Sequence, residues 1–210
     1  RVALVNVDVL SKKVSESDRN SYPLIGDAAS ITIVENECDA GSVYADVQLD
    51  GSRCMALKIP AGGFRLPSSD ATGVLVEDEE GNRRSLDNLV MDGSAVFNFA
   101  MQEVPTLIES VLMASGLDKQ SVDYFLFHQP NQFMLQKLAE KLGIPYEKMP
   151  SNVVQKYGNS SSVTIPAVVS LNLAERICRE GFTVCFSGFG AGLTKGAMTM
   201  RTGKWRFCDT

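Results

Sequence analysis

The stretch YFLFHQPNQFMLQKLAEKLG, residues 124–143, contains a strand pattern, a polar turn and a helix pattern in direct succession. The apolar run begins at Val122 and ends at Phe127, and it has the length and composition of a buried strand. Residues 132–142 then place apolar side chains three and four apart, and a glycine follows them as a helix end. The turn contains His128, the only histidine in the chain, so this unit delivers one imidazole at a strand end.

Asn159 lies thirty-one residues after His128, in the polar segment of residues 157–162. An imidazole and an amide can both donate hydrogen bonds without carrying a charge, and two such donors can converge on one carbonyl oxygen. Gly158, next to the amide, would let the backbone turn tightly. The alternative is that His128 is a hydrogen-bonded core residue with no chemical role, and the spacing alone leaves both interpretations open.

The rest of the chain alternates between strand and helix patterns. Short apolar or alternating runs predict strands over residues 2–7, 31–34, 43–49, 55–59, 122–127, 152–154, 182–186 and 193–200. Helical spacing predicts helices over residues 97–112, ending near Gly116, and over residues 132–142 and 160–178. Residues 61–88, rich in Gly, Ser, Asp and Arg, predict a loop. This order favours an α/β domain in which helices cover a sheet.

Local signals add detail to these elements. The first two strands have continuous apolar runs typical of burial, and the strands over residues 43–49 and 55–59 are expected in one sheet with a wetter face. Pro105 should bend or break the first helix. The serines that follow Asn159 are expected to cap the last helix, which has Pro166 close to its first turns.

Composition and charge narrow the class of protein. Hydrophobic residues make up 44% of the 210 residues, which is ample for a core, and the net charge is −5 with both signs scattered. No clustered basic stripe is present, so a nucleic-acid surface is not expected. No apolar run approaches a membrane span, and the first residues lack the pattern of a secretory signal. The expected compartment is the cytoplasm, without membrane association.

The five cysteines form no metal-binding or disulfide pattern. They are odd in number, without a CxxC pair or a histidine at ligand spacing, so free thiols and no metal site are expected at Cys38, Cys54, Cys178, Cys185 and Cys208. A reactive thiolate needs a helix N-terminus or a nearby cation, whereas Cys185 lies in an apolar strand run and Cys178 near a helix end. We therefore expect none of them to be a nucleophile.

The glycines of residues 188–192 follow a predicted strand, a position where glycine-rich turns can cradle phosphate. Residues 193–200 then alternate like a strand instead of opening a helix, and no acidic residue closes a βαβ unit. The sequence therefore argues against nucleotide binding at this turn.

The order of these motifs resembles the β-ketoacyl-ACP synthase III branch of the thiolase superfamily. The resemblance covers nearly the whole chain, through the His-Gln-x-Asn and Gly-Asn-Ser motifs and further segments at residues 8–10, 26–30, 91–97 and 188–192. It implies a thiolase-like α/β fold, with a complete C-terminal half over residues 37–210 and the last strands of the N-terminal half over residues 1–36. The family's cysteine nucleophile precedes the strand that residues 1–7 resemble. The chain is therefore expected to be the C-terminal two thirds of a longer protein.

The resemblance also implies a reaction. Family members transfer an acyl group from a coenzyme A thioester to the cysteine and condense it with malonyl-ACP in a decarboxylating Claisen reaction, with no permanently bound cofactor. His128 and Asn159 match the family's catalytic pair, so His128 Nε2–H and the Asn159 amide would stabilise the enolate. The backbone N–H of Ala191, beside Gly190, would complete an oxyanion hole for the acyl thioester. A homodimer is implied for the full-length protein.

Two further residues have a structural alternative. Asn131 would brace the loop that carries His128, and it could equally be the N-cap of the following helix. Phe97 matches a residue that lines the substrate channel, and its helical spacing also fits core packing. Gln132 and Phe133 stand where the family often has an arginine for docking coenzyme A or acyl carrier protein. The positive charge for docking would then come from lysines, at Lys137, Lys141 and Lys148.

Three functions remain open from the sequence. The first is a condensing enzyme whose cysteine lies upstream, and in that case the chain alone should be inactive. The second is a non-catalytic partner subunit of a condensing heterodimer, in which the cysteine has been replaced. The third is a cysteine hydrolase with a Cys-His-Asn triad of another lineage, which the absence of a local signature around any cysteine disfavours.

Overall fold

A computed structural model describes residues 1–36 and 40–210, so Cys38 and the predicted boundary at residue 37 lie outside the described residues. The central element is a four-stranded sheet in the order β3 (Tyr44–Leu49), β10 (Thr194–Arg201), β9 (Thr183–Gly190) and β8 (Tyr124–Phe127). The first three are antiparallel neighbours, whereas β8 runs parallel to β9.

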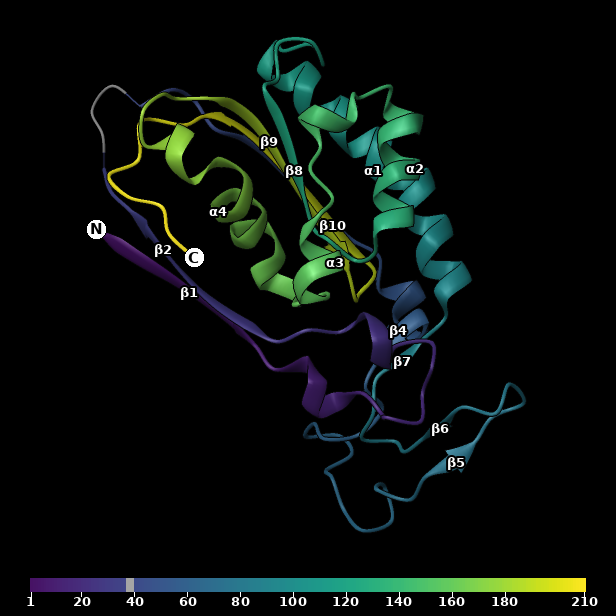
Figure 1. The fold of residues 1–210 in the computed structure, drawn as a ribbon. Helices are drawn as coiled ribbons and strands as arrows, with labels where there is room; N and C mark the ends of the chain where they lie inside the picture. The colour runs from purple at the N-terminus through teal and green to yellow at the C-terminus, as the bar shows by residue number, and fades with distance from the viewer. Residues whose placement is uncertain (37–39) are drawn as a thin grey trace.

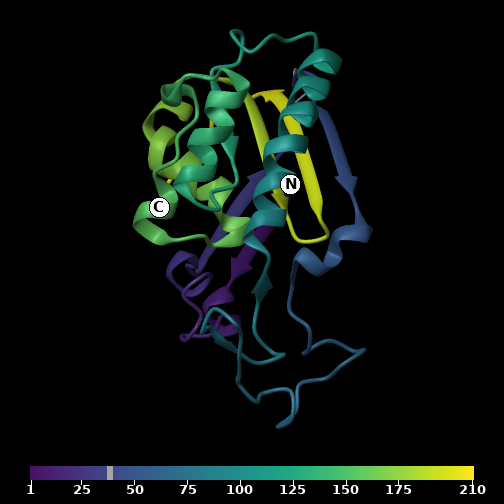
Figure 2. The ribbon, with the colours of Figure 1, turned by 90° about the vertical axis from the view of Figure 1, so that its right-hand side faces the viewer.

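Helices cover both faces of this sheet (Figure 1). On one face lie α1 (Gly93–Ser115) and α2 (Gln132–Leu142), and on the other lies α4 (Thr164–Ile177) with the short α3 (Val153–Tyr157) beside it. Figure 2 shows α1 in front of the hairpin formed by β9 and β10. The predicted α/β domain with a covered sheet is confirmed.

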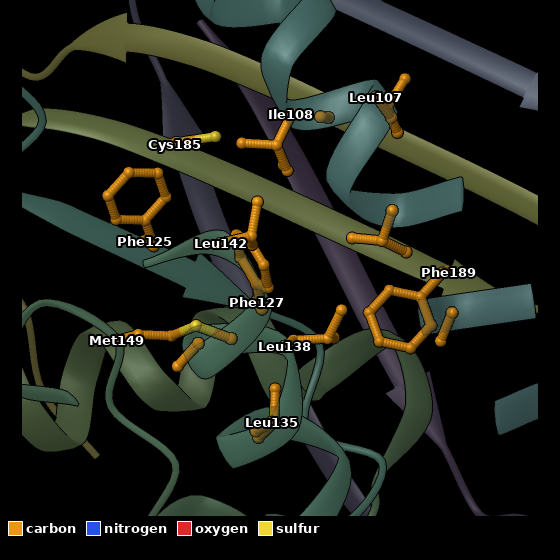
Figure 3. Packing of buried hydrophobic residues seen from close by; sticks show 14 of the residues in the cluster. Leu107, Ile108, Phe125, Phe127, Leu135, Leu138, Leu142, Met149, Cys185 and Phe189 are labelled. Carbon is orange, nitrogen blue, oxygen red and sulfur yellow. The ribbon is translucent and has the colours of Figure 1, made fainter. Parts of the chain in front are cut away.

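Large apolar side chains fill the space between the sheet and the helices α1 and α2. Figure 3 shows side chains of both helices directed at residues of β8 and β9, among them Leu107, Ile108, Leu138, Phe127 and Phe189. A second buried cluster, between the sheet and α4, includes Leu126 of β8. Each fully buried side chain of this size stabilises the fold by about 1.5–3 kcal/mol. The two clusters together fix β8, the strand that leads into His128.

The predicted ends of the first two helices are confirmed. Gly116 and Gly143 follow α1 and α2 in the left-handed conformation, with φ of +69° and +65°, which glycine adopts without strain. α1 continues through Pro105 as one helix, so no break occurs there. The side chain of Asp92 accepts a hydrogen bond from the Ala95 N–H and begins α1.

The strands β1 (Val2–Asp8) and β2 (Ala28–Val34) form an antiparallel hairpin, which is a sheet of its own. The expectation that these apolar strands are buried was wrong for the described residues. Val2, Leu4 and Val7 are each more than half exposed, as is Ile31 on the partner strand. The sequence pattern identified strands, but burial depends on a second layer. In the described part of the chain α4 and η5 (Ser161–Val163) contact the hairpin, yet they leave most of its large apolar side chains exposed.

Short elements connect these units, namely η1 (Leu10–Lys13), η2 (Tyr22–Leu24), η3 (Gly51–Ala56), β4 (Leu57–Lys58), β5 (Val76–Glu77), β6 (Arg83–Arg84), β7 (Val90–Met91), η4 (Tyr146–Lys148) and η5 (Ser161–Val163). The strand predicted over residues 55–59 is only partly present. Met55 belongs to η3, and β4 pairs with β7 instead of joining the sheet of β3. Residues 61–88 are a loop apart from the small β5–β6 hairpin, as predicted.

Two local predictions near Asn159 were wrong. Residues 153–157 form the helix α3 instead of a strand, because Val153 is fully buried beside α4 and Gly158 ends the turn. The serines after Asn159 do not cap α4 with their side chains. They are engaged elsewhere, since Ser162 Oγ bonds the Asp8 carboxylate. Across residues 1–36 and 40–210, the helices are all too short or too polar to cross a membrane.

Candidate functional site

His128 follows the last residue of β8 and is held by the neighbouring strand β9. Its backbone N–H donates to the Ser187 carbonyl at 2.8 Å, which extends the pairing of the two strands. The ring of Phe189, two residues further along β9, meets the imidazole edge-on with ring centroids 5.6 Å apart. The position of His128 is therefore set by both the backbone and a side chain of β9.

Asn159 is held by a segment from the start of the chain. Its N–H donates to the Leu24 carbonyl at 2.7 Å, and its carbonyl accepts from the Gly26 N–H at 3.1 Å. These bonds form an isolated parallel bridge centred on Ile25. Gly158 enters this contact with φ of +74° and ψ of −178°, a conformation that is essentially restricted to glycine.

The amide of Asn159 is oriented by Ser161, two residues later. The backbone N–H of Ser161 donates to Asn159 Oδ1 at 2.9 Å. Because Oδ1 is the acceptor end of the amide, this bond leaves the Nδ2 end as the donor for another partner. Ser161 has a φ of +49°, which is uncommon outside glycine, asparagine and aspartate. Backbone outliers of this kind cluster at functional sites, so the conformation fits a role in positioning the amide.

Thr164, the first residue of α4, connects the imidazole to the same serine. Its Oγ1 lies 2.7 Å from His128 Nδ1, and the hydroxyl donates to the Ser161 carbonyl at 2.8 Å. Ser161 thus contacts Asn159 through its N–H and Thr164 through its carbonyl. The imidazole and the amide, distant in sequence, are tied to one residue.

The surroundings of His128 favour the uncharged imidazole. Part of the residue stays accessible, but burial still lowers the pKa of His128 from 6.5 to about 4. The Ser161 carbonyl and the Asp8 carboxylate raise the pKa by smaller amounts. His128 is therefore neutral at pH 7 and offers a hydrogen-bonding nitrogen, Nε2, without a positive charge.

Asp8, at the end of β1, ties the hairpin to the site. Its Oδ2 accepts from the Ser162 N–H at 3.0 Å and from the Ser162 hydroxyl. Ser162 follows Ser161, which bonds Asn159. The Asp8 carboxylate therefore anchors the turn of residues 159–162 to β1. The backbone bridge at Ile25 and this side-chain contact hold the turn on two sides.

Two of the other predicted site residues have a clear structural place. Asn131 is the N-cap of α2, because its Oδ1 accepts from the Met134 N–H at 2.8 Å. The side chain of Phe97 is partly buried against the core and stacks on Phe133, with centroids 5.9 Å apart. A substrate role for either residue stays a prediction.

Gly190 is the last residue of β9, and Ala191 follows it in the turn to β10. The next residues form a strand and not a helix, as expected, so the geometry of a nucleotide-binding helix N-terminus is missing here. Phe189 packs on His128 and links this turn to the site. The role predicted for the Ala191 N–H stays a prediction.

None of the cysteines in the described residues has the environment of a nucleophile. Burial raises the pKa of Cys185 to about 12, and burial also raises the pKa of Cys208. Cys54 is exposed in η3, and Cys178 lies at the end of α4. Residues 1–36 and 40–210 likewise contain no group of three or more His, Cys, Asp or Glu side chains that could hold a metal ion.

The lysines considered for docking differ in their contacts. Lys137 pairs with Glu140 at 2.7 Å and lies over the ring of Phe133. Lys148 donates to the backbone carbonyls of Gln120 and Val122, so it stabilises a loop. In the described part of the chain, Lys137 and Lys148 therefore have structural partners. Only part of the positive charge expected for docking is free of such contacts.

Comparison with known proteins identifies families and structures that are similar to this chain. The family model described as 3-oxoacyl-[acyl-carrier-protein (ACP)] synthase III C terminal matches residues 112–202, which include His128, Asn159 and Ala191. A β-ketoacyl-[acyl-carrier-protein] synthase III of Synechococcus sp. strain WH7803 is 32% identical over 201 residues, covering 96% of this chain and 57% of that protein. Over nearly its whole length, the chain is similar to proteins of the β-ketoacyl-ACP synthase III family.

Solved structures of the synthase III family share the fold of this chain. The crystal structure of 3-oxoacyl-(acyl-carrier protein) synthase from Burkholderia xenovorans LB400 superposes with a TM-score of 0.87 at 36% identity, covering all of this chain and 58% of that one. In sequence, a β-ketoacyl-[acyl-carrier-protein] synthase III of Streptococcus gordonii is 34% identical over 197 residues, covering 93% of this chain and 57% of that protein. The chain thus spans somewhat more than half the length of the synthase III relatives it matches.

Sequence reasoning missed the residues that hold His128 and Asn159 in place. Thr164 was included in a predicted helix without a role, although it lies five residues after Asn159 at the helix start. Ser161 gave no signal, because positive φ at a serine cannot be read from its side chain. Asp8 and Phe189 belonged to quoted motifs, but the contacts they make are long-range.

Proposed function

We propose that the protein containing this chain is a 3-oxoacyl-ACP synthase III. It joins an acyl group from a coenzyme A thioester to malonyl-ACP by a decarboxylating Claisen condensation. The observation that carries the proposal is the common anchor of His128 and Asn159 on Ser161, which holds an uncharged imidazole and an outward amide as one unit. The similarity to β-ketoacyl-ACP synthase III proteins supports the same reaction class.

The difficult species in this reaction is the enolate formed when malonyl thioester loses carbon dioxide. Its negative oxygen needs hydrogen-bond donors that are already in position, and Asn159 Nδ2–H is oriented for this task by Ser161. His128 contributes through Nε2, the ring nitrogen that Thr164 leaves unoccupied. The acyl group is carried by a cysteine that the family places outside this chain, consistent with the unsuitable surroundings of Cys185.

The finer features of the proposal follow from the family resemblance. We infer that the enzyme has no permanently bound cofactor, that coenzyme A thioester is a substrate, and that the full-length protein is a cytoplasmic homodimer. Ala191 N–H and Gly190 serve the oxyanion hole of the acyl thioester. Phe97 lines the substrate channel, and Asn131 braces the loop that carries His128. Residues 1–36 belong to the first thiolase-like half and residues 37–210 to the second, which agrees with the separate sheet of β1 and β2.

The test is condensation by the full-length protein, with acetyl-CoA and malonyl-ACP as probes and mass spectrometry of the product. We expect 3-oxoacyl-ACP and carbon dioxide, and Asn159→Ala should lower the condensation rate about 10²-fold to 10³-fold. Transfer of the acyl group to the protein in the first half-reaction should persist in this variant. Absence of condensation by the folded parent protein, together with activity only after a second subunit is added, would favour the partner-subunit alternative.

A further inference from the structure

Asp18 has a buried carboxylate that lies outside the site of His128 and Asn159. Its Oδ2 accepts from Arg84 Nε and from the Ser21 hydroxyl, each at 2.6 Å. Its Oδ1 accepts from the Asn20 N–H at 2.9 Å and from Arg84 Nη2 at 3.2 Å. A carboxylate has about four lone-pair sites, so these four donors satisfy it completely. Burial alone raises the pKa of Asp18, but these bonds lower the pKa below its usual value, so the group is charged at pH 7.

Arg84, the partner of this carboxylate, comes from β6 in the loop of residues 61–88. The β5–β6 hairpin lies outside the central sheet, below β4 and β7 in Figure 1. The guanidinium reaches Asp18 with two nitrogens and Asp78 of its own hairpin with the third, Nη1, at 2.8 Å. Such forked pairs fix the orientation of both partners. The hairpin is therefore docked on the start of the chain by an almost buried ion pair.

The donors of Asp18 lead in a few steps to the contact with Asn159. Ser21 donates its hydroxyl to Asp18, and its carbonyl accepts the Leu24 N–H at 3.0 Å. The Leu24 carbonyl in turn accepts the Asn159 N–H at 2.7 Å. The single turn of η2 joins the two contacts. Asp18 thus holds Ser21, Ser21 holds Leu24, and Leu24 holds the residue with the amide donor.

We propose that Arg84 and Asp18 are positioning residues for Asn159. Their ion pair keeps residues 18–26 in the shape that presents the Leu24 carbonyl to the Asn159 backbone. Docking of the β5–β6 hairpin and placement of the amide are then one coupled event, carried by a continuous chain of hydrogen bonds. As far as catalysis is concerned, this inference rests on the proposed function.

The coupling follows from the cost of an unpaired buried charge. Without the Arg84 cation, the Asp18 carboxylate keeps only two of its four donors, a state that is strongly unfavourable in a buried position. The carboxylate then turns toward water and releases or draws with it the hydroxyl of Ser21. Leu24 follows, since η2 is too short to absorb the movement. Neither Arg84 nor Asp18 bonds Asn159 itself, so their effect on the reaction passes through the Leu24 carbonyl.

Hydrogen exchange of the full-length protein tests the positioning without a substrate. Arg84→Met removes the cation and should raise the exchange rate of the Asn159 N–H roughly tenfold, the effect of about one hydrogen bond. The His128 N–H, which bonds the Ser187 carbonyl in the sheet, should keep its parent rate. Mass spectrometry with fragmentation to single amides measures both rates. An unchanged rate at Asn159, or an equal rise at both amides, overturns the proposal.

Arg83→Met is the matched control, because Arg83 precedes Arg84 in β6 and its side chain is exposed. It should leave both exchange rates at their parent values. A control that raises the Asn159 rate as much as Arg84→Met does also overturns the proposal. If the Arg84→Met protein does not fold, Arg84→Lys decides. Lysine keeps the charge but loses the fork, so the Asn159 rate should rise by a smaller factor, and a parent rate there overturns the proposal.

Kinetics show whether the ion pair acts through Asn159. In an active enzyme, Arg84→Met should lower kcat for malonyl-ACP decarboxylation about tenfold. In the Asn159→Ala background, the same substitution should lower kcat by less than about twofold, because the side chain to be positioned is absent. Equal losses in the two backgrounds mean that Arg84 acts elsewhere, and they overturn the proposal.

The exchange rates separate this inference from the proposed function. A protein with the expected local change at Asn159 but no condensation activity refutes only the proposed function. A condensing enzyme in which Arg84→Met leaves the Asn159 rate unchanged refutes only the inference.

Discussion

Gly26 and Gly158 face each other so closely that neither position has room for a side chain. A Cβ at Gly158 would lie 2.8 Å from the Gly26 nitrogen, and a Cβ at Gly26 would lie 1.8 Å from the Tyr157 carbonyl oxygen. The obstacles are backbone atoms, which cannot rotate away. The two glycines let the start of the chain approach the turn that carries Asn159.

Gly26→Ala should therefore separate the two segments. We expect a loss of unfolding free energy of about 2–3 kcal/mol, in the range of an overpacked site, and a larger loss of condensation rate than the stability change alone explains. Urea unfolding and steady-state kinetics measure the two effects. Gly63→Ala is the matched control, because a Cβ there meets no atom within 4 Å, and it should leave both unchanged.

Asn159→Asp should be more damaging to condensation than Asn159→Ala. The aspartate can still accept from the Ser161 N–H at 2.9 Å, so the turn is preserved. It replaces the amide donor by a carboxylate that repels the enolate, whereas alanine only removes the donor. Rates of malonyl decarboxylation in both variants check the order. Equal rates in the two would contradict the role of Nδ2.

The stability of the protein should depend on His128 between about pH 4 and pH 6.5. Because burial lowers the pKa of His128 to about 4, the unfolded chain binds a proton in this window that the folded chain does not. The contribution is complete above pH 6.5 and is lost as the pH falls toward 4, by on the order of 3 kcal/mol. Urea unfolding at a series of pH values measures it. His128→Gln should show a flatter dependence over the same window.

Glu103→Gln should destabilise the contact between α1 and β10. Glu103 pairs with Lys195 and Arg53, each at 2.5 Å, and these cations lower the pKa of Glu103 although burial alone raises it. Lys195 is only 9% exposed, so removing the carboxylate leaves a nearly buried ammonium unpaired, at a cost of about 3 kcal/mol. The double variant Glu103→Gln with Lys195→Met should recover most of the loss. Urea unfolding of the parent, of each single variant and of the double variant completes the cycle.

Cys185 should be inert to alkylation in the folded protein. It is fully buried in β9 and burial raises its pKa to about 12, whereas Cys54 is exposed. Iodoacetamide should modify Cys54 first and Cys185 only after unfolding, and peptide mass spectrometry detects the modified residues.

Residues 1–210 alone should not condense acetyl-CoA with malonyl-ACP. Condensation by this chain would show that one of its own cysteines is the nucleophile.

Elements with long, regular patterns could be predicted from the sequence. The bounds of α2 agree with the expected helix, and β9 and β10 were expected as strands from the runs on both sides of Ala191. α3 was not, because three residues around Val153 are too few to distinguish a strand from a helical turn. Burial of β1 could not be predicted, since it depends on what another layer covers.

The two candidate catalytic residues could be predicted from the sequence, but the residues that hold them in place could not. His128 and Asn159 were identified from motif order and residue type, and the alternative role of Asn131 as an N-cap was anticipated and is confirmed. Thr164 and Ser161 are hydrogen-bonded to them through a backbone turn with positive φ. Local sequence carries little information on such a turn, because tertiary contacts with Asp8 and Leu24 hold it.

The bridge between Ile25 and Asn159 joins points more than a hundred residues apart in the chain. Closing so long a loop lowers the conformational entropy of the chain before the contact contributes any favourable free energy. Such pairings therefore form slowly in folding. The Asn159 amide then reaches its final position only when the segment around Ile25 has docked on it. A partly folded chain would have His128 at the end of β8 without Asn159 beside it. The complete site therefore exists only in the fully folded chain.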